Sequence, residues 1–336
     1  MSLVQNRIIA QLAQELGAAQ SQIKAAVDLL DEGSTVPFIA RYRKEATGGL
    51  DDAVLRDLQE RLVYLRELED RRGSILESIE SQGKLTPELK AAIEKAENKQ
   101  TLEDLYLPYK PKRRTRAQIA REAGLQPLAD AILENRQAVP EELAAAYLNA
   151  EHQINDTKAA LDGARDILAE QFSENAALLA LLRKRLNSEG AIRAAVVPEK
   201  ASEAIKFQDY FEHQEPLSST ASHRMLAMLR GREQGFLTLK VDLPEVWEAE
   251  NPRTPHPFES EIARLHGVER EDSPRGKFMN EVCRWTWKIK LASTLESEVI
   301  GTLRDAAQAE AISVFGKNLK DLLLSAPAGG KATMGL

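Results

Sequence analysis

The sequence predicts a mainly α-helical, multi-helical protein, and three observations support this fold class. Strong helix formers (Ala, Leu, Glu, Gln, Arg and Lys) dominate the composition. Aromatic residues make up only 5% of the chain, against 43% hydrophobic and 29% charged residues. Apolar residues recur at spacings of three and four, as on the buried face of an amphipathic helix. Together these features are typical of a folded globular protein and not of a disordered one.

Length, charge and cysteine content narrow the class further. A chain of 336 residues suggests about two domains. No apolar run approaches the roughly 18 residues of a membrane span, and the amphipathic N-terminus carries no signal-peptide core. The single cysteine, Cys283, excludes an internal disulfide framework, so we expect a reducing cytoplasm and no membrane association. Because the net charge is −7, binding to a polyanion must come from a local patch.

The N-terminal part predicts short helices followed by a longer one. Residues 2–50 contain three amphipathic segments separated by glycine turns, with Pro37 in the first turn of the third. This arrangement is compatible with a helix-turn-helix unit. A longer helix is predicted to begin at Asp51 or Asp52 and to run to about Gln82. Its apolar residues form a seam against another helix: Leu55, Leu58, Leu62 and Leu65.

The pattern of apolar residues in the sequence changes near residue 190. Two short apolar segments, AIRAAVVP and GFLTLKVDLP, predict a few short strands within 190–245, with a helix between them that ends at Gly231. From Lys277 to Leu324 no proline occurs and apolar residues keep helical spacing. One helix of that length would measure about 70 Å and would form a spine, with Gly301 and Gly316 as bend points.

These features divide the chain into three regions. We predict a helical region at 1–195 and a central region at 196–326 that ends in the spine helix. Residues 327–336 are expected to be a linker and the start of a further, truncated domain.

One basic stretch stands out in this acidic chain. The segment YLPYKPKRRTRAQIARE spans Tyr106–Glu122 and predicts a helix starting at Thr115, with Gln118 at the capping-box position. Cations are normally disfavoured at a helix start, whereas free N–H groups and guanidinium groups together bind anions. Tyr106 and Tyr109 would offer stacking faces. The candidate nucleic-acid-binding residues in this stretch are Lys110, Lys112, Arg113, Arg114 and Arg116.

Two other interpretations of the basic stretch remain open. Its cations can neutralise a nearby acidic helix, and surface ion pairs of this kind are common. A nuclear localisation signal is the third interpretation, although the stretch is expected to be part of a folded turn. The acidic segment in question carries Glu60, Glu67, Glu69 and Asp70.

A second candidate cluster consists of Arg41, Arg43 and Lys44, with Tyr42 between the arginines. These three cations are also proposed to bind nucleic acid. The alternative is that Phe38, Ile39 and Tyr42 lie in the core while the cations are merely solvated.

Sequence patterns for catalysis are lacking. The chain contains no phosphate-binding loop and no dinucleotide fingerprint. None of the histidines has HExxH spacing, and we interpret them as surface or loop residues. Cys283 lies between apolar residues, which favours a packed thiol over a nucleophile. We therefore expect no enzyme, no cofactor and no metal site.

Long strings of the sequence resemble the N-terminal region of the Tex family of bacterial transcription accessory proteins. They are LLDEGSTVPFIARYRKEATGGLDD, TLEDLYLPYKPKRRTRAQIAREAGL, KFQDYFEHQEPLSSTASHRMLAMLRGREQG and EVCRWTWKIKL. The resemblance covers nearly the whole chain. It implies a helical region with a helix-turn-helix-like part and a long central helix. An RNase H-like domain, helix-hairpin-helix units and a C-terminal OB-fold RNA-binding domain would follow beyond Leu336.

The resemblance implies a nucleic-acid-binding factor involved in transcription, of which this chain is the helical scaffold. Single-stranded RNA or DNA is the expected partner, bound mainly through domains absent from this chain, together with RNA polymerase or other transcription proteins. The alternative is an architectural module that contacts the transcription or translation machinery without binding nucleic acid itself. A nuclease would need paired carboxylates on a strand, and the sequence offers none.

Overall fold

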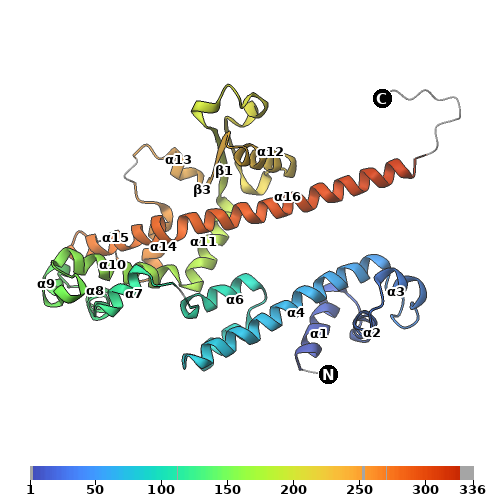
Figure 1. Cartoon of the computed structure of the whole chain (residues 1–336), viewed down its shortest axis with the longest axis horizontal. Coiled ribbons are helices and arrows are strands. Elements are labelled where there is room, and N and C mark those ends of the chain that lie inside the picture. The colour runs from blue at the N-terminus through green and yellow to red at the C-terminus, as the bar shows by residue number, and fades with distance from the viewer. Residues whose placement is uncertain (1–2, 112, 252–253, 270, 326–336) are drawn as a thin grey trace. The chain divides into compact units, whose positions relative to one another are not determined.

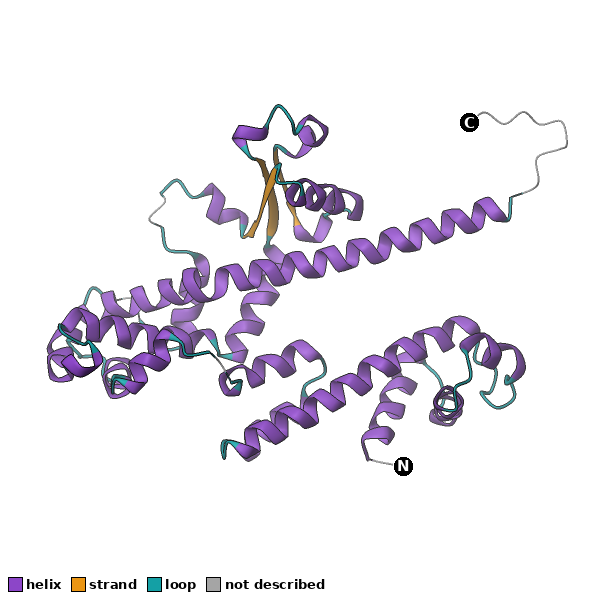
Figure 2. Ribbon diagram, in the orientation of Figure 1, coloured by secondary structure: helices purple, strands orange, loops and turns teal. Residues whose placement is uncertain are grey.

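A computed structural model describes residues 3–111, 113–251, 254–269 and 271–325. The chain divides into two compact units, unit 1 at Met1–Lys110 and unit 2 at Pro111–Leu336. The described residues are mainly helical, as the composition predicts, and their strands form one small sheet (Figures 1 and 2). None of the described helices has an apolar stretch long enough to cross a membrane. The predicted regions 1–195 and 196–326 stay a prediction, and 327–336 lies outside the described residues.

Unit 1 is built on one long helix. Asp51 caps its start by accepting a hydrogen bond from the Val54 N–H, and the predicted leucine seam is buried. The first three helices pack against it, and their apolar residues share one core with it. The helices of unit 1 are α1 (Leu3–Leu16), α2 (Gln20–Asp31), α3 (Val36–Tyr42), α4 (Asp52–Ser81), α5 (Pro87–Lys95) and α6 (Lys99–Tyr106).

Unit 2 places a small sheet among many helices. Its helices are α7 (Arg116–Glu122), α8 (Gln126–Glu134), α9 (Pro140–Ala144), α10 (Thr157–Ser173), α11 (Ala176–Glu189), α12 (Ser222–Glu233), α13 (Pro244–Glu248), α14 (Pro257–Leu265), α15 (Pro274–Trp285) and α16 (Ala292–Leu323). Its strands are β1 (Ala191–Val196), β2 (Glu212–Pro216) and β3 (Leu237–Asp242), in the antiparallel order β2-β1-β3.

The sheet is only partly foreseen from the sequence. The two predicted strands are β1 and β3, in a register that places Ile192 opposite Val241. The third strand, β2, has the sequence EHQEP, whose polar residues give no strand signal. The predicted helix end at Gly231 is wrong, because α12 continues to Glu233. Gly231 is buried there, and a Cβ on it would lie 2.5 Å from a Leu237 methyl carbon, so glycine permits the close packing of α12 on β3.

The spine helix predicted from Lys277 to Leu324 is confirmed, with a local change of winding. α15 passes into α16 through a π-helical segment at Thr286–Leu291. The first half of α16 packs against α12, and Ala307 is its last buried residue. From Gln308 to Ser325 every residue is exposed. Gly301 and Gly316 lie inside α16, so neither interrupts the helix.

Candidate nucleic-acid interface

The third helix presents two different faces. Val36 and Ile39 are buried in the core of unit 1 and pack toward α4. Phe38 and Tyr42, which are four residues apart and therefore neighbours on one helix face, are 41% and 61% exposed. Their ring centroids lie 5.4 Å apart with the rings tilted by 47°. The interpretation that placed both aromatic residues in the core is therefore wrong, whereas it is right for Ile39.

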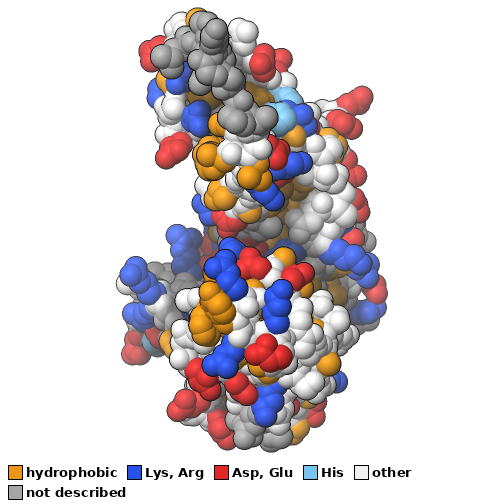
Figure 3. All heavy atoms as spheres, turned by 90° about the vertical axis from the view of Figure 1, so that its right-hand side faces the viewer, with side chains coloured by type: hydrophobic (Ala, Val, Ile, Leu, Met, Phe, Trp, Pro, Cys, Tyr) orange, Lys and Arg blue, Asp and Glu red, His pale blue; other side chains and the backbone are white. Residues whose placement is uncertain are grey.

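The cations of the second candidate cluster lie next to Tyr42 in the sequence, and all of them are exposed. We call the exposed side chains of Phe38, Arg41, Tyr42, Arg43 and Lys44 the α3 patch. Within the described part of the chain, none of its three cations forms an ion pair. Figure 3 shows apolar side chains together with Lys, Arg, Asp and Glu side chains on the face of unit 1 that carries α3. Aromatic faces and unpaired cations therefore occur together on this surface.

A rigid turn supports the α3 patch. The hydroxyl of Thr47, a fully buried residue, donates to the Arg43 carbonyl at 3.2 Å. Gln22 on α2 donates to the carbonyls of Thr47 and Gly48 at 3.2 and 2.9 Å. Gly48 has φ of 60°, and a Cβ there would lie 2.6 Å from the Gln22 side-chain nitrogen. The backbone that carries Arg43 and Lys44 is thus anchored to the fold. α3 itself ends at Tyr42, so Gly48 and Gly49 belong to this turn and lie beyond the helix.

The aromatic residues of the basic stretch are less available than the sequence suggested. Tyr106 is only 6% exposed, and its hydroxyl lies 2.9 Å from that of Ser78. Tyr109 is half-buried and packs against the core of unit 1. The stacking role expected for Tyr106 is therefore wrong, because α4 and α6 enclose its ring. Lys110 is exposed at the end of unit 1, and Lys112 lies outside the described residues.

The arginines of the basic stretch belong to unit 2. Thr115 caps α7 by accepting a hydrogen bond from the Gln118 N–H at 3.0 Å, as predicted. Arg114 is bound to Glu122, with its Nε 3.0 Å from the carboxylate oxygen. Arg113 and Arg116 are exposed, and neither forms an ion pair with another described residue. The interpretation that these cations neutralise nearby acids is thus right for Arg114, although its partner is Glu122 at the end of α7 and not a residue of the acidic segment at 60–70.

α7 buries its small residues and not its large one. Ile119 is 46% exposed, whereas Ala117 and Ala120 are buried. α7 packs closely on α10, where Gly163 faces Ala120. A Cβ on Gly163 would lie 3.2 Å from the Ala120 Cβ, so only small residues fit at this contact. The helix therefore turns its alanine face inward and leaves the larger Ile119 in solvent.

A cavity in unit 2 was not anticipated from the sequence. Its volume is about 930 Å³, and it lies between the α13–α14 connection and α15. Its charged lining has both signs, which gives no net attraction for a polyanion. Three of these side chains are engaged in ion pairs: Glu245 with Arg185, Lys277 with Asp272 and Glu281 with Arg165. The other charged residues of the lining are Glu259, Arg284 and Lys288.

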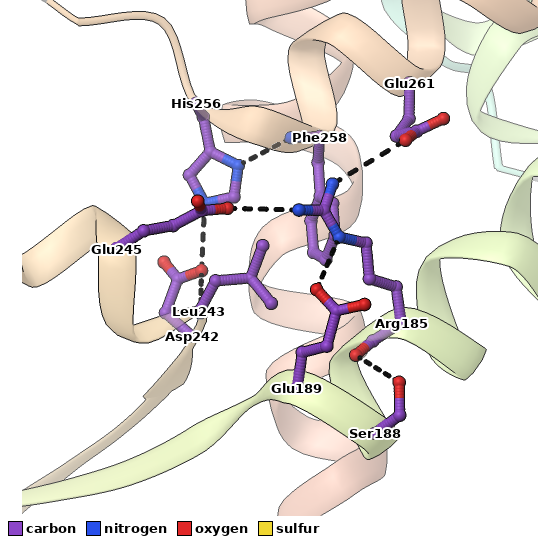
Figure 4. Close-up of polar contacts among 9 residues, drawn as sticks. All are labelled: Arg185, Ser188, Glu189, Asp242, Leu243, Glu245, His256, Phe258 and Glu261. Carbon is purple, nitrogen blue, oxygen red and sulfur yellow. Dashed lines mark hydrogen bonds and ion pairs between the residues drawn. The ribbon is translucent and has the colours of Figure 1, made fainter.

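The polar network beside this cavity is structural (Figure 4). Arg185 on α11 reaches carboxylates on α11, α13 and α14, namely Glu189 at 2.9 Å, Glu245 at 3.1 Å and Glu261 at 3.6 Å. Its guanidinium carbon also lies 5.9 Å from the centre of the Phe258 ring. One arginine therefore joins three elements of unit 2.

Two histidines near α14 are packed into the fold. His256 lies in a loop, donates from Nε2 to Asp242 at 2.9 Å and accepts at Nδ1 from the Phe258 N–H at 3.1 Å. Both of its ring nitrogens are therefore occupied. His266 stacks on Phe172 with ring centroids 3.8 Å apart, and burial lowers the pKa of His266 to about 4. Among the residues that the structure describes, no group of side chains forms a metal site.

The fold and the surface together define the class of protein. The chain is a mainly helical protein with an exposed patch of cationic and aromatic side chains on α3. Comparison with known proteins gives the family: a model described as Tex-like protein N-terminal domain matches residues 6–80, and one described as Tex central region-like matches residues 135–315. The chain belongs to the Tex family, as the sequence resemblance indicated.

The relatives that match this chain are much longer than it. The chain is 61% identical over 335 residues to "Protein tex" of Bordetella pertussis and 53% identical over 330 residues to "Transcriptional accessory protein Tex" of Neisseria gonorrhoeae. It covers 42% of the length of each, while 98% and 97% of the chain are matched. A human "S1 RNA-binding domain-containing protein 1" is 29% identical over 327 residues, which cover 92% of this chain and 31% of that protein.

Proposed function

We propose that this chain is the helical scaffold of a cytoplasmic, non-catalytic transcription accessory factor that binds nucleic acid, and that the α3 patch contributes phosphate contacts. The printed names of the relatives support a role in transcription and an association with RNA. Single-stranded RNA or DNA is the expected ligand of the whole protein. RNA polymerase or another transcription protein is the expected protein partner.

One observation carries this proposal: the cations of the α3 patch are exposed and unpaired in a chain whose net charge is −7. Six of the eight arginines of unit 1 form ion pairs, and the two exceptions among the described residues are Arg41 and Arg43. Lys44 lies next to them on the anchored turn. A site that keeps its cations free of carboxylates can offer them to phosphates, whose neutralisation releases counterions and favours binding.

The test is a salt titration with charge-reversed variants of the whole chain. Wild-type protein is titrated against a 20-nucleotide single-stranded RNA and a 20-base-pair DNA duplex at 50 and 150 mM salt. Contacts from the three cations to a single strand predict a contribution of about −2 to the slope of log K against log salt. Arg41→Glu, Arg43→Glu and Lys44→Glu combined should abolish this contribution and weaken binding by more than about tenfold.

A matched control changes the net charge of unit 1 by the same amount as the α3 triple variant. Lys84, Lys90 and Lys95 are exposed and lie outside the α3 patch. Their combined replacement by Glu should weaken binding by less than about threefold, because long-range repulsion between exposed charges is screened. If both triple variants weaken binding equally, net charge and not the α3 patch explains the affinity. A parallel variant, Arg113→Glu with Arg116→Glu, measures the share of the basic stretch.

A second candidate function has its own observation. Beyond Ala307, α16 exposes large apolar side chains that a solvated helix does not need. Their exposed fractions are Ile312 72%, Val314 51%, Phe315 68%, Leu319 43%, Leu322 71%, Leu323 74% and Leu324 73%. Such a segment suits an architectural module whose helix end packs against other parts of a longer chain or against another protein.

The two candidates separate in a stability experiment. Phe315→Asp with Leu322→Asp should leave the melting temperature of this chain unchanged, because both side chains are exposed here. The corresponding changes in a full-length relative should lower its melting temperature by several degrees if the segment is covered there. Unchanged stability in the full-length protein would count against the architectural role.

A further inference from the structure

The aromatic pair of the α3 patch is not explained by phosphate binding. Phe38 and Tyr42 together place two large rings on one exposed helix face, 41% and 61% exposed. Cations alone are sufficient to contact phosphates, so the rings add nothing to that task. Single exposed apolar residues are ordinary on protein surfaces, but two adjacent aromatic rings bordered by three unpaired cations indicate a binding surface.

These rings are not the exposed remainder of a loosely packed helix. The face of α3 that carries Val36 and Ile39 is packed in the core. The side chains of these two residues are 4% and 0% exposed. The turn that follows is fixed by the hydrogen bonds from Gln22 to Thr47 and Gly48. Because one face of the short helix is buried and the turn after it is hydrogen-bonded, the rings lie on a preorganised support that loses little conformational freedom on binding.

Ring geometry and charge favour one occupant. The rings are tilted by 47°, so neither covers the face of the other, and both can take a further planar partner. A protein partner that buried the rings would have to remove Arg41, Arg43 and Lys44 from water as well. A single strand of nucleic acid instead supplies an unpaired base to each ring and a phosphate to each cation. A duplex satisfies only the cations, because its bases are stacked within the helix.

We propose that Phe38 and Tyr42 form a base-stacking platform for single-stranded nucleic acid, and that they make the α3 patch discriminate single strands from duplexes. This inference rests on the proposed function, because Arg41, Arg43 and Lys44 hold the phosphates of the same strand. Phosphate contacts bring either kind of nucleic acid to the surface, and the rings then favour the strand whose bases are free to stack.

The experiment measures the preference for single strands. Fluorescein-labelled dodecauridylate and a 12-base-pair duplex are titrated against the whole chain at 50 mM salt. Phe38→Ala with Tyr42→Ala should weaken binding to the single strand by about tenfold or more and binding to the duplex by less than about twofold. Phe38→Leu with Tyr42→Leu keeps the apolar surface without the rings and should show the same selective loss. Phe315→Ala, which removes an exposed ring from α16, is the matched control.

A spectroscopic readout tests stacking directly. In the Phe38→Trp variant, the single strand should quench the added tryptophan fluorescence and the duplex should not, relative to the wild-type protein. Since all these side chains are exposed, folding is checked by circular dichroism, and a variant that has lost its helical signal is replaced by the corresponding leucine variant.

The outcomes separate the platform from the proposed function. If both aromatic variants bind the single strand as tightly as wild type while the charge-reversed α3 variant does not, the platform is overturned and the phosphate role stands. A protein partner would then be the explanation for the exposed rings. Equal losses on single strand and duplex would also overturn the platform. If reversal of the three cations leaves both affinities unchanged, the proposed function fails with it.

Discussion

The arginines of α4 and those of the α3 patch have opposite relationships to the same fold. Along α4, Arg61 binds Glu15 of α1 with contacts of 2.6 and 2.8 Å, and Arg66 binds Asp31 of α2 with two contacts of 2.7 Å. These side chains join helices. On α3, Arg41 is exposed and has no ion pair among the described residues. The density of cations in a sequence therefore does not measure the charge that a surface offers to a ligand.

The basic stretch at 106–122 is a second example in which many cations in the sequence do not give an equally available cationic surface. It has more cations than the α3 segment, yet Arg114 is held by Glu122 and the ring of Tyr106 is buried. The sequence made this stretch the stronger candidate because it contains no acid between Lys110 and Arg116. Pairing with Glu122, which lies beyond that window, changes the ranking. The α3 patch is therefore the better supported of the two candidate surfaces.

The largest expected effect distinguishes the two faces of α3. Ile39→Ala should lower the free energy of unfolding by about 3 kcal/mol, because it leaves a cavity at a fully buried site. Phe38→Ala, on the exposed face, should change it by less than about 0.5 kcal/mol. Urea denaturation followed by circular dichroism measures both. A loss of more than about 1.5 kcal/mol for Phe38→Ala would show that the aromatic face is structural.

The next largest effect is the difference in stability loss between replacing a buried arginine and replacing an exposed one. Arg72 is 6% exposed and donates to the main-chain carbonyls of Ile93 and Ala96, the latter at 2.9 Å. Arg72→Ala should cost about 2 kcal/mol of stability, since it leaves these carbonyls without their donor. Arg41→Ala should leave stability unchanged within about 0.5 kcal/mol, as measured by the same denaturation. A comparable loss for both would remove the distinction between structural and available cations.

Periodicity was sufficient to predict most of the helical framework. The leucine seam and the cap at Asp51 placed α4, and the absence of proline after Lys277 placed the spine formed by α15 and α16. These signals are local. Single residue types do not fix every helix start. Ser21 is of a type that often caps a helix, yet α2 begins at Gln20 after Ala19, and the side chain of Gln22 accepts from the Ala19 N–H at 3.0 Å. The cap of α6 is Asn98, which accepts from the Thr101 N–H.

The sequence identified the cations of the candidate site, but it did not show that the two aromatic side chains beside them are exposed. Arg41, Arg43 and Lys44 were identified from their clustering. The alternative interpretation placed Phe38 and Tyr42 in the core together with Ile39. One signal was available: residues 38 and 42 share one helix face, whereas 36 and 39 are centred on a neighbouring face. Which of the two faces is buried depends on α4, which packs against α3 from a distant part of the sequence.

The smallest expected effect concerns acid sensitivity of the paired arginines. The hydrogen bond from Arg61 lowers the pKa of Glu15 below its ordinary value of 4.5, and the one from Arg66 lowers that of Asp31 below 3.8. A carboxylate whose pKa is lowered by folding binds fewer protons in the folded state than in the unfolded state. Its stabilising contribution is therefore present above the unfolded pKa and is lost as the pH falls through the folded pKa.

Between pH 5 and pH 3, α1 and α2 should consequently lose protection against amide hydrogen exchange. Because both pairs are partly exposed and therefore screened by solvent, the loss should correspond to only about 0.5 kcal/mol per pair. Arg61→Gln with Arg66→Gln should flatten this dependence, since the two carboxyl groups then titrate near their ordinary pKa values in both states. Arg56→Gln is the control, because Arg56 pairs with Asp52 within α4 and joins no second helix. If the double variant loses protection as steeply as wild type, these two pairs do not hold α1 and α2 on α4, and their contrast with the unpaired cations of α3 fails.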